Sequence, residues 1–337
     1  MKTNRLFVLV LVVSFFLAAC GGAAAPAATQ TGAVKLKVVT TVSPITNIIY
    51  NVGGDKIDLT GIIPEGSDSH TFEPAPSTAA LFATADVVFV NGLHLEEPTR
   101  KMAAANAKAG SEMVILGEKT LTPDQYMFDF SFPKSGGNPN PHLWMNPMNA
   151  LSYAQIAHDT LVRLDPANAD FYTKNFEAYK LRLMALDAAI KASTATIPEA
   201  NRKLLTYHDS FAYFAPRYGL TVIGAIQPAD FAEPSAKEVA DLIKQIRDEH
   251  VPAIFGSEVF PSPTLAQIAK ETGAKYEASL RDDDLPGVVG DANHSYLGLL
   301  TYDVRTITTD LGGTAIALDN FDTSNIPGLD STVHQQQ

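Results

Sequence analysis

The sequence has one cysteine, one tryptophan and few charged residues, and each scarcity excludes a class of protein. Cysteine occurs once in 337 residues, at Cys20, so an intramolecular disulfide is excluded and the fold depends on packing. Charged residues make up 18% of the chain, and acidic residues outnumber basic ones by 37 to 25. The formal charge of −12 argues against a nucleic-acid partner, because phosphates require a basic surface.

The N-terminus carries an apolar run that is too short to cross a bilayer. Lys2 and Arg5 precede apolar residues 6–19, a run shorter than the ~20 residues that a membrane helix needs. Residues 1–19 therefore read as a signal peptide. Small residues directly before Cys20 resemble a bacterial lipobox, in which the cysteine is acylated and becomes the mature N-terminus. We expect an extracytoplasmic protein that is lipid-anchored to the bacterial cell membrane through Cys20.

Beyond the signal peptide, the composition separates a tether from a globular part. Residues 20–34 consist almost entirely of glycine, alanine, proline, threonine and glutamine, which have little to bury and predict a flexible tether. The whole chain is 46% hydrophobic, which is enough for a large core. Its length predicts two domains rather than one.

Strand and helix patterns alternate along the chain in two sets, which predicts an α/β fold. The expected strands of the first set cover residues 36–41, 57–63, 87–91 and 113–116. The expected strands of the second set cover residues 203–207, 221–225, 253–255 and 275–278, with helices at 211–218, 235–249 and 264–272. Most of these strands are continuously apolar, which is typical of a buried parallel sheet covered by helices on both faces.

A long helical pattern lies between the two sets. Aromatic and aliphatic residues recur at spacings of three and four from Tyr172 to Ile190, which predicts one long helix with a single apolar stripe. We expect this rigid helix, at 167–196, to join an N-terminal lobe at 35–166 to a C-terminal lobe at 197–325. A polar tail at 326–337 ends the chain.

Four of the eight histidines lie in loops between expected strands and helices. His70, His208 and His294 each follow an expected strand, and His142 lies in a loop that Pro139, Pro141 and Pro147 restrict. Ligands of open parallel sheets bind beyond the carboxyl ends of the strands. Two of these histidines belong to each lobe, so the cleft between the lobes is where they can converge.

Imidazole is the commonest metal ligand, and three or four histidines suit zinc. The four histidines are 72, 66 and 86 residues apart, so no local metal motif is present and the inference depends on the fold. A metal-dependent hydrolase is the alternative from another class of protein. Catalytic zinc requires an open coordination position and a nearby base, as in the motif HExxH, which the sequence lacks.

Several motifs in a fixed order resemble one family. They are the lipobox, the run from Asn91 to Glu96, and the runs GSDSHTFEP (66–74), PHLWMNP (141–147), YHDSF (207–211) and SYLGL (295–299). Together they resemble the zinc- and manganese-binding lipoproteins of bacterial ABC importers, cluster A-I of the solute-binding proteins. The resemblance covers nearly all of residues 36–320. It implies a monomer that delivers a divalent metal to a membrane permease and its ATPase.

The resemblance also implies a set of metal ligands. His70, His142 and His208 correspond to three of them, and the third is a histidine where manganese-type members often carry glutamate. At the position expected for the fourth ligand, an aspartate before a Ser/Thr-Tyr pair, this chain has His294, with Asp291 as the alternative. Glu258 resembles a family glutamate that orients a ligand, although a solvated loop carboxylate is the other interpretation.

The histidine-rich ligand set predicts zinc, with manganese as the alternative metal. Imidazole nitrogen suits zinc, whereas carboxylate oxygen suits manganese, and zinc leads manganese in the Irving–Williams order. The loop at 117–141 contains no histidine, so the histidine-rich insertion of many zinc-transporting members is missing here. We therefore expect one zinc ion per molecule, held between the lobes.

Overall fold

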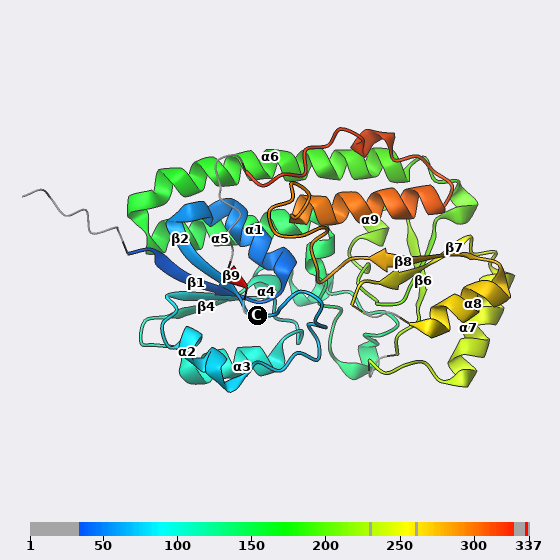
Figure 1. The fold of residues 1–337 in the computed structure, drawn as a ribbon, viewed down its shortest axis with the longest axis horizontal. Coiled ribbons are helices and arrows are strands. Elements are labelled where there is room, and N and C mark those ends of the chain that lie inside the picture. The colour runs from blue at the N-terminus through cyan, green and yellow to red at the C-terminus, as the bar shows by residue number, and fades with distance from the viewer. Residues whose placement is uncertain (1–33, 229–230, 260–261, 327–333, 336–337) are drawn as a thin grey trace, which may run out of the picture. The chain divides into compact units, whose positions relative to one another are not determined.

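A computed structural model describes residues 34–228, 231–259, 262–326 and 334–335 (Figure 1). The expected signal peptide, Cys20 and the tether up to residue 33 lie outside the described residues. The chain from Lys35 onward forms one compact unit. Within the described ranges, no helix is long and apolar enough to cross a bilayer.

The first sheet contains five parallel strands in the order β4-β3-β1-β2-β9. Their bounds are β1 (Leu36–Thr40), β2 (Ile57–Gly61), β3 (Val87–Val90), β4 (Glu112–Ile115) and β9 (His334–Gln335). All four residues of β3 are buried, which explains its continuous run of apolar residues. The sheet is therefore covered on both faces.

Alternate residues of each strand point to opposite faces of the first sheet, and helices pack against both faces. Val38 and Phe89 pack with α1 (Ser43–Gly53) and α5 (Pro147–Leu164). Val39 and Val88 face the other way and pack with α2 (Ala79–Phe82) and α3 (Glu97–Asn106). A short helix, α4 (Leu116–Thr120), follows β4 directly.

One helix runs along both halves of the molecule. It is α6 (Ala169–Thr194), 26 residues long, and Figure 1 shows it passing over both sheets. Its buried residues include Tyr172, Phe176, Tyr179, Leu183, Leu186 and Ile190, the stripe that the sequence predicts. The prediction of two parallel sheets joined by one long helix is confirmed.

The second sheet contains four parallel strands in the order β6-β5-β7-β8. They are β5 (Lys203–Thr206), β6 (Thr221–Ala225), β7 (Ala253–Ser257) and β8 (Lys275–Leu280). One face packs against α7 (Ala236–Asp248) and α8 (Pro263–Thr272), and the other packs against α9 (Tyr296–Asp310). Ser235 and Glu238 form a capping box that fixes the start of α7.

The structure differs from the sequence predictions in three places. The helix expected at 211–218 is only a 3₁₀ turn at Ala215–Tyr218, because Pro216 has no amide hydrogen for a helix that starts earlier. No expectation covered α9, whose first turn is capped by Ser295. Within the expected polar tail, β9 pairs with β2, the strand that would otherwise expose its edge.

Candidate metal centre

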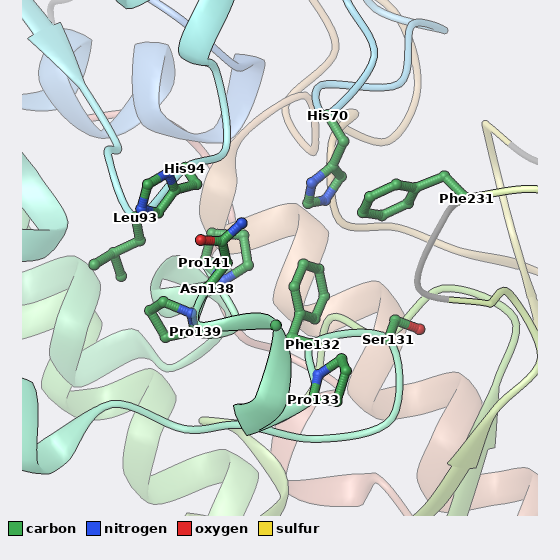
Figure 2. Close-up of a pocket in the computed structure, with 11 residues that line it drawn as sticks. His70, Leu93, His94, Ser131, Phe132, Pro133, Asn138, Pro139, Pro141 and Phe231 are labelled. Carbon is green, nitrogen blue, oxygen red and sulfur yellow. The ribbon is translucent and has the colours of Figure 1, made fainter.

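A pocket of about 190 Å³ leads from the surface to His70. Figure 2 shows His70 on one wall beside Phe231 and Phe132, with Leu93 and His94 across the pocket. The ring centroids of His70 and Phe231 are 4.6 Å apart, and those of His70 and Phe132 are 5.5 Å apart. His70 is therefore the partly exposed end of a site that continues inward.

His70 lies in the loop that follows β2. The carboxylate of Asp68 accepts hydrogen bonds from the backbone N–H of His70, at 2.9 Å, and from the hydroxyl of Thr71, at 2.7 Å. These bonds form a local turn of the kind that aspartate favours. Ser69 donates its backbone N–H and its hydroxyl to Asp283 of the second half, each at 3.0 Å. The His70 loop is thus attached at both sides of the cleft.

His142 lies directly before a 3₁₀ turn (Leu143–Met145) that leads into α5. Pro147 occupies the first turn of α5, and the side chain of Asn146 caps it by accepting the N–H of Met148. Trp144 is fully buried, and its ring packs edge-on against that of His142 at 5.1 Å. The segment around His142 is therefore rigid, as the prolines predict.

His208 follows β5 at the carboxyl edge of the second sheet. The hydroxyl of Thr206 donates to the backbone carbonyl of His208 at 2.6 Å, which fixes the turn after the strand. His208 and its neighbour Asp209 are buried. The ring therefore projects from the end of a central strand of the second sheet, toward the first half.

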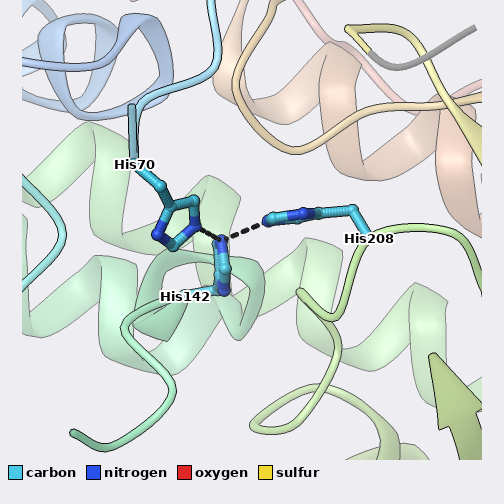
Figure 3. Close-up of side chains that lie close together, drawn as sticks. All are labelled: His70, His142 and His208. Atoms are coloured by element: carbon cyan, nitrogen blue, oxygen red, sulfur yellow. Dashed lines mark hydrogen bonds between the residues drawn. The ribbon is translucent and has the colours of Figure 1, made fainter. Parts of the chain in front are cut away.

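The structure brings three of the four expected histidines together. The Nε2 atoms of His70 and His142 are 3.1 Å apart, and those of His142 and His208 are 3.0 Å apart (Figure 3). One ligand atom from each ring lies within 4.8 Å of the others. Two of these rings come from the first half and one from the second, so the triad lies between the lobes.

The hydrogen bonds at Nδ1 of His142 and His208 indicate which nitrogen of each ring carries the proton. Nδ1 of His142 donates to Oδ1 of Asn140 at 2.8 Å, and Nδ1 of His208 donates to Oε1 of Gln227 at 2.6 Å. Both amide oxygens can only accept, so in the neutral rings the hydrogen sits on Nδ1 and Nε2 carries a lone pair. Two lone pairs then face each other at 3.0 Å, an arrangement that a cation between them would stabilise.

The spacing and burial of the triad suit a transition metal. A tetrahedral zinc ion with Zn–N bonds of ~2.0–2.1 Å separates its ligand nitrogens by about 3.3 Å, close to the 3.1 and 3.0 Å that separate Nε2 of His142 from those of His70 and His208. Burial lowers the pKa of His70 and His142, and the neighbouring His208 lowers both further. Both rings are therefore held in the neutral form that binds metal.

The carboxylate of Asp282 lies beside the triad, and no motif in the sequence pointed to it. Oδ2 of Asp282 lies 3.4 Å from Nε2 of His208 and 4.0 Å from Nε2 of His142. Asp282 is 3% exposed, and this oxygen has no hydrogen-bond partner among the described residues. Burial, followed by the nearby Glu258, raises the pKa of Asp282 well above its usual value. A bound cation would relieve that penalty.

Neither His294 nor Asp291 belongs to the group of close ligand atoms that His70, His142 and His208 form among the described residues. Nε2 of His294 lies 3.6 Å from Oε1 of Glu65. Oδ2 of Asp291 accepts the N–H of Val288 at 3.1 Å and so closes its own turn. The signal that could have revealed Asp282 was its position directly beyond β8, the same strand-end rule that indicated His208.

Glu258 supports the turn that carries Asp282. Its Oε1 accepts the backbone N–H groups of Asp282, Asp283 and Asp284 at 2.9, 3.2 and 3.1 Å. Burial raises the pKa of Glu258, although these hydrogen bonds act in the opposite direction. A carboxylate with three backbone donors is not a solvated loop group, so Glu258 fixes the position of Asp282.

The comparisons with known proteins agree with this geometry. A family model described as the periplasmic component A of a zinc-uptake complex matches residues 38–310. The chain belongs to this family. It is the metal-binding, substrate-binding component of an ABC importer and not an enzyme.

Two curated relatives span nearly the same length as this chain. A metal ABC transporter substrate-binding lipoprotein, ScbA of Streptococcus cristatus, is 30% identical over 316 residues, which cover 92% of this chain and 99% of that protein. The manganese ABC transporter substrate-binding lipoprotein PsaA of Streptococcus pneumoniae is 26% identical over 310 residues, with the same coverage.

A solved structure has the same fold. The periplasmic zinc-binding protein TroA from Treponema pallidum superposes with a TM-score of 0.75 at 25% identity. The match covers 82% of this chain and 99% of that one. The relatives thus include proteins described by zinc and proteins described by manganese, so the family alone leaves the metal undecided.

Proposed function

We propose that this protein captures zinc between its two lobes and delivers it to the permease and ATPase of its importer. The observation that carries the proposal is the pair of Nε2 lone pairs of His142 and His208, which face each other at 3.0 Å. His70 supplies the third nitrogen, and Asp282 supplies an oxygen in place of the expected His294. The set of three nitrogens and one oxygen fits a four-coordinate zinc ion.

The ligand set favours zinc over manganese for two reasons. Manganese prefers carboxylate and water ligands, whereas three of the four proposed ligands are imidazoles. Zinc also leads manganese in the Irving–Williams order for a site with nitrogen ligands. Asp282 in its ionised form neutralises one of the two positive charges of the ion, and the ion in turn favours that form over the neutral acid. This compensation makes a buried dication tolerable.

Elemental analysis tests the choice of metal. Protein purified without a histidine tag should contain close to one zinc per molecule, and a competition titration should show zinc bound more tightly than manganese. If the protein is instead specific for manganese, it should retain manganese from a medium that contains both metals. Protein with neither metal, and no affinity for either, would contradict the proposal.

We also propose that an acyl group on Cys20 holds the protein, as a monomer, at the outer face of the cell membrane. The lipobox-like sequence supports this proposal, as do the relatives whose descriptions name them lipoproteins. A Cys20→Ala variant should leave the membrane fraction while its metal binding stays unchanged. If the variant remained in the membrane fraction after cleavage of the signal peptide, the anchor would be assigned wrongly.

A further inference from the structure

The long loop between α4 and α5 crosses from the first half of the molecule to the second. Ser131 donates its backbone N–H to Oδ2 of Asp209 at 2.8 Å and its hydroxyl to the carbonyl of Gln227 at 2.7 Å. The N–H of Met127 donates to the hydroxyl of Tyr213 at 3.0 Å. A loop that belongs to the first half is therefore attached to three residues of the second.

Asn140 closes the base of this loop and makes a further contact across the cleft. Its backbone N–H donates to the carbonyl of Met127 at 2.9 Å, and its Nδ2 donates to the carbonyl of Asp209 at 2.6 Å. Its Oδ1 accepts Nδ1–H of His142. Asn140 is fully buried, and both ends of its amide are hydrogen-bonded. One side chain thus connects a ligand of the first half to the residue that follows His208.

Gln227 makes the complementary connection in the second half. Its side chain accepts Nδ1–H of His208, and its backbone carbonyl accepts the hydroxyl of Ser131. The two residues that fix the proton positions of His142 and His208 are therefore also the residues through which the loop joins the halves. The halves cannot separate around these ligands unless the hydrogen bonds of Ser131 and Asn140 break.

We propose that Met127, Ser131 and Asn140 form a clasp between the lobes that sets the rate at which the bound metal leaves. This inference rests on the proposed function, because the clasp has a role only if a metal is held at the triad. Ser131 and Asn140 are positioning residues, since they act through Gln227, Asp209 and His142. Their loss should speed dissociation of the metal.

The chain offers matched controls at exposed positions. Ser135, in the same loop, and Asn320 are exposed, whereas Ser131 and Asn140 are buried. Zinc-loaded protein is mixed with excess chelator in a stopped-flow instrument, and the dissociation rate is followed by the absorbance of the zinc–chelator complex. Ser131→Ala should release zinc about 3- to 10-fold faster than wild type, the effect of losing one net hydrogen bond. Ser135→Ala should match wild type.

The variant Asn140→Asp separates two roles of this residue. A carboxylate at position 140 still accepts Nδ1–H of His142, but it can donate neither to the carbonyl of Asp209 nor to the carboxylate of Asp129, the two partners of the amide nitrogen. If Asn140 acts as a clasp, zinc leaves faster from Asn140→Asp than from the control Asn320→Asp. If it acts only on His142, the charged acceptor holds the ring at least as well and zinc leaves no faster, which would overturn the proposal.

Two further outcomes are decisive. If Ser131→Ala lowers the melting temperature of the metal-free protein as much as that of the loaded protein and leaves the dissociation rate unchanged, the loop is merely structural and the clasp is refuted. If wild type and Ser135→Ala bind no zinc at all, the proposed function fails and the clasp fails with it. Failure of the clasp alone thus differs from failure of the function.

Discussion

The two halves of the molecule contribute different chemistry to the metal site. The first half supplies His70 and His142. Burial lowers the pKa of each imidazole, so both are uncharged metal ligands. The second half supplies His208 and, in our proposal, the carboxylate of Asp282, whose pKa burial and Glu258 raise. The unfavourable burial of a charged carboxylate, which a dication would relieve, therefore lies in the second half. A bound metal should stabilise that half more than the first.

The halves also differ in how they hold their ligands. His142 is fixed by its sequence neighbours Asn140 and Trp144. Asp282 is fixed by Glu258, which lies 24 residues earlier on the neighbouring strand end. The first arrangement is local and the second depends on the completed sheet, so the two should respond differently to mutation.

The largest expected effect is the loss of a histidine of either half. His142→Ala and His208→Ala should each lower zinc affinity by more than the roughly 100-fold that loss of an outer hydrogen-bond partner can cost. A competition titration against a chromophoric chelator measures the change. His158→Ala is the control, because His158 lies on α5 and bonds to Asp159 and Thr173, which are not part of the site. Retained tight binding in His142→Ala would contradict the triad.

The next largest effect should separate Asp282 from His294. Asp282→Asn keeps the shape of the side chain but removes the charge, and we expect zinc affinity to fall by at least about tenfold, in line with the loss of a charged partner. His294→Gln and Asp291→Asn should bind zinc like wild type. The reverse pattern, with His294→Gln weakened and Asp282→Asn unaffected, would restore the ligand expected from the sequence.

Much of the fold and three of the site residues could be predicted because their signals are local. The continuous apolar strands and the stripe of α6 follow from residue spacing alone. His70 and His208 could be recognised because each follows a buried strand, and His142 because prolines restrict its loop. Each of these signals lies within a few residues of the side chain it concerns.

The rest could not be predicted because it depends on contacts between distant segments. Three consecutive aspartates follow β8, and the sequence does not say which of them reaches the triad. Hydrogen bonds decide: Asp283 and Asp284 bind the N–H groups of Ser69 and Gly66, which leaves Asp282 to face the histidines. His294 was favoured because of the Ser-Tyr pair after it; in the structure this pair caps and begins α9, and the Tyr296 hydroxyl donates to the carbonyl of Trp144.

A smaller effect should appear in the pH dependence of binding. Zinc binds the neutral imidazole, and burial lowers the pKa of His70 and His142 below the usual ~6.5, so their protons are already absent at pH 7. Zinc affinity should therefore change little from pH 8 to about 6.5 and fall at lower pH. Titrations at a series of pH values measure it. A zinc affinity that already falls between pH 8 and about 6.5 would contradict the lowered pKa values of these two histidines.

The smallest effect concerns how α6 is attached to the two halves. Asn175 joins it to the first half through a neutral hydrogen bond to the carbonyl of Val52. Asp187 joins it to the second half through Arg217 and Tyr218. Burial alone would raise the pKa of Asp187, but hydrogen bonds from Arg217, Lys191 and Tyr218 outweigh it and lower the pKa to about 2.

Because the folded pKa of Asp187 lies below its unfolded value of 3.8, the stability it contributes is fully present above pH 3.8 and is lost as the pH falls through about 2. Arg217→Gln should lower the free energy of unfolding by about 1–2 kcal/mol at pH 7, a figure reduced for the partial exposure of Arg217. The difference from wild type should shrink as the pH falls from 3.8 toward 2. Urea unfolding at each pH measures it, with Arg163→Gln, from an exposed pair with Glu112, as the control. A loss of stability in Arg217→Gln that stayed constant down to pH 2 would mean that Arg217 holds α6 to the second half by packing and not through its charge.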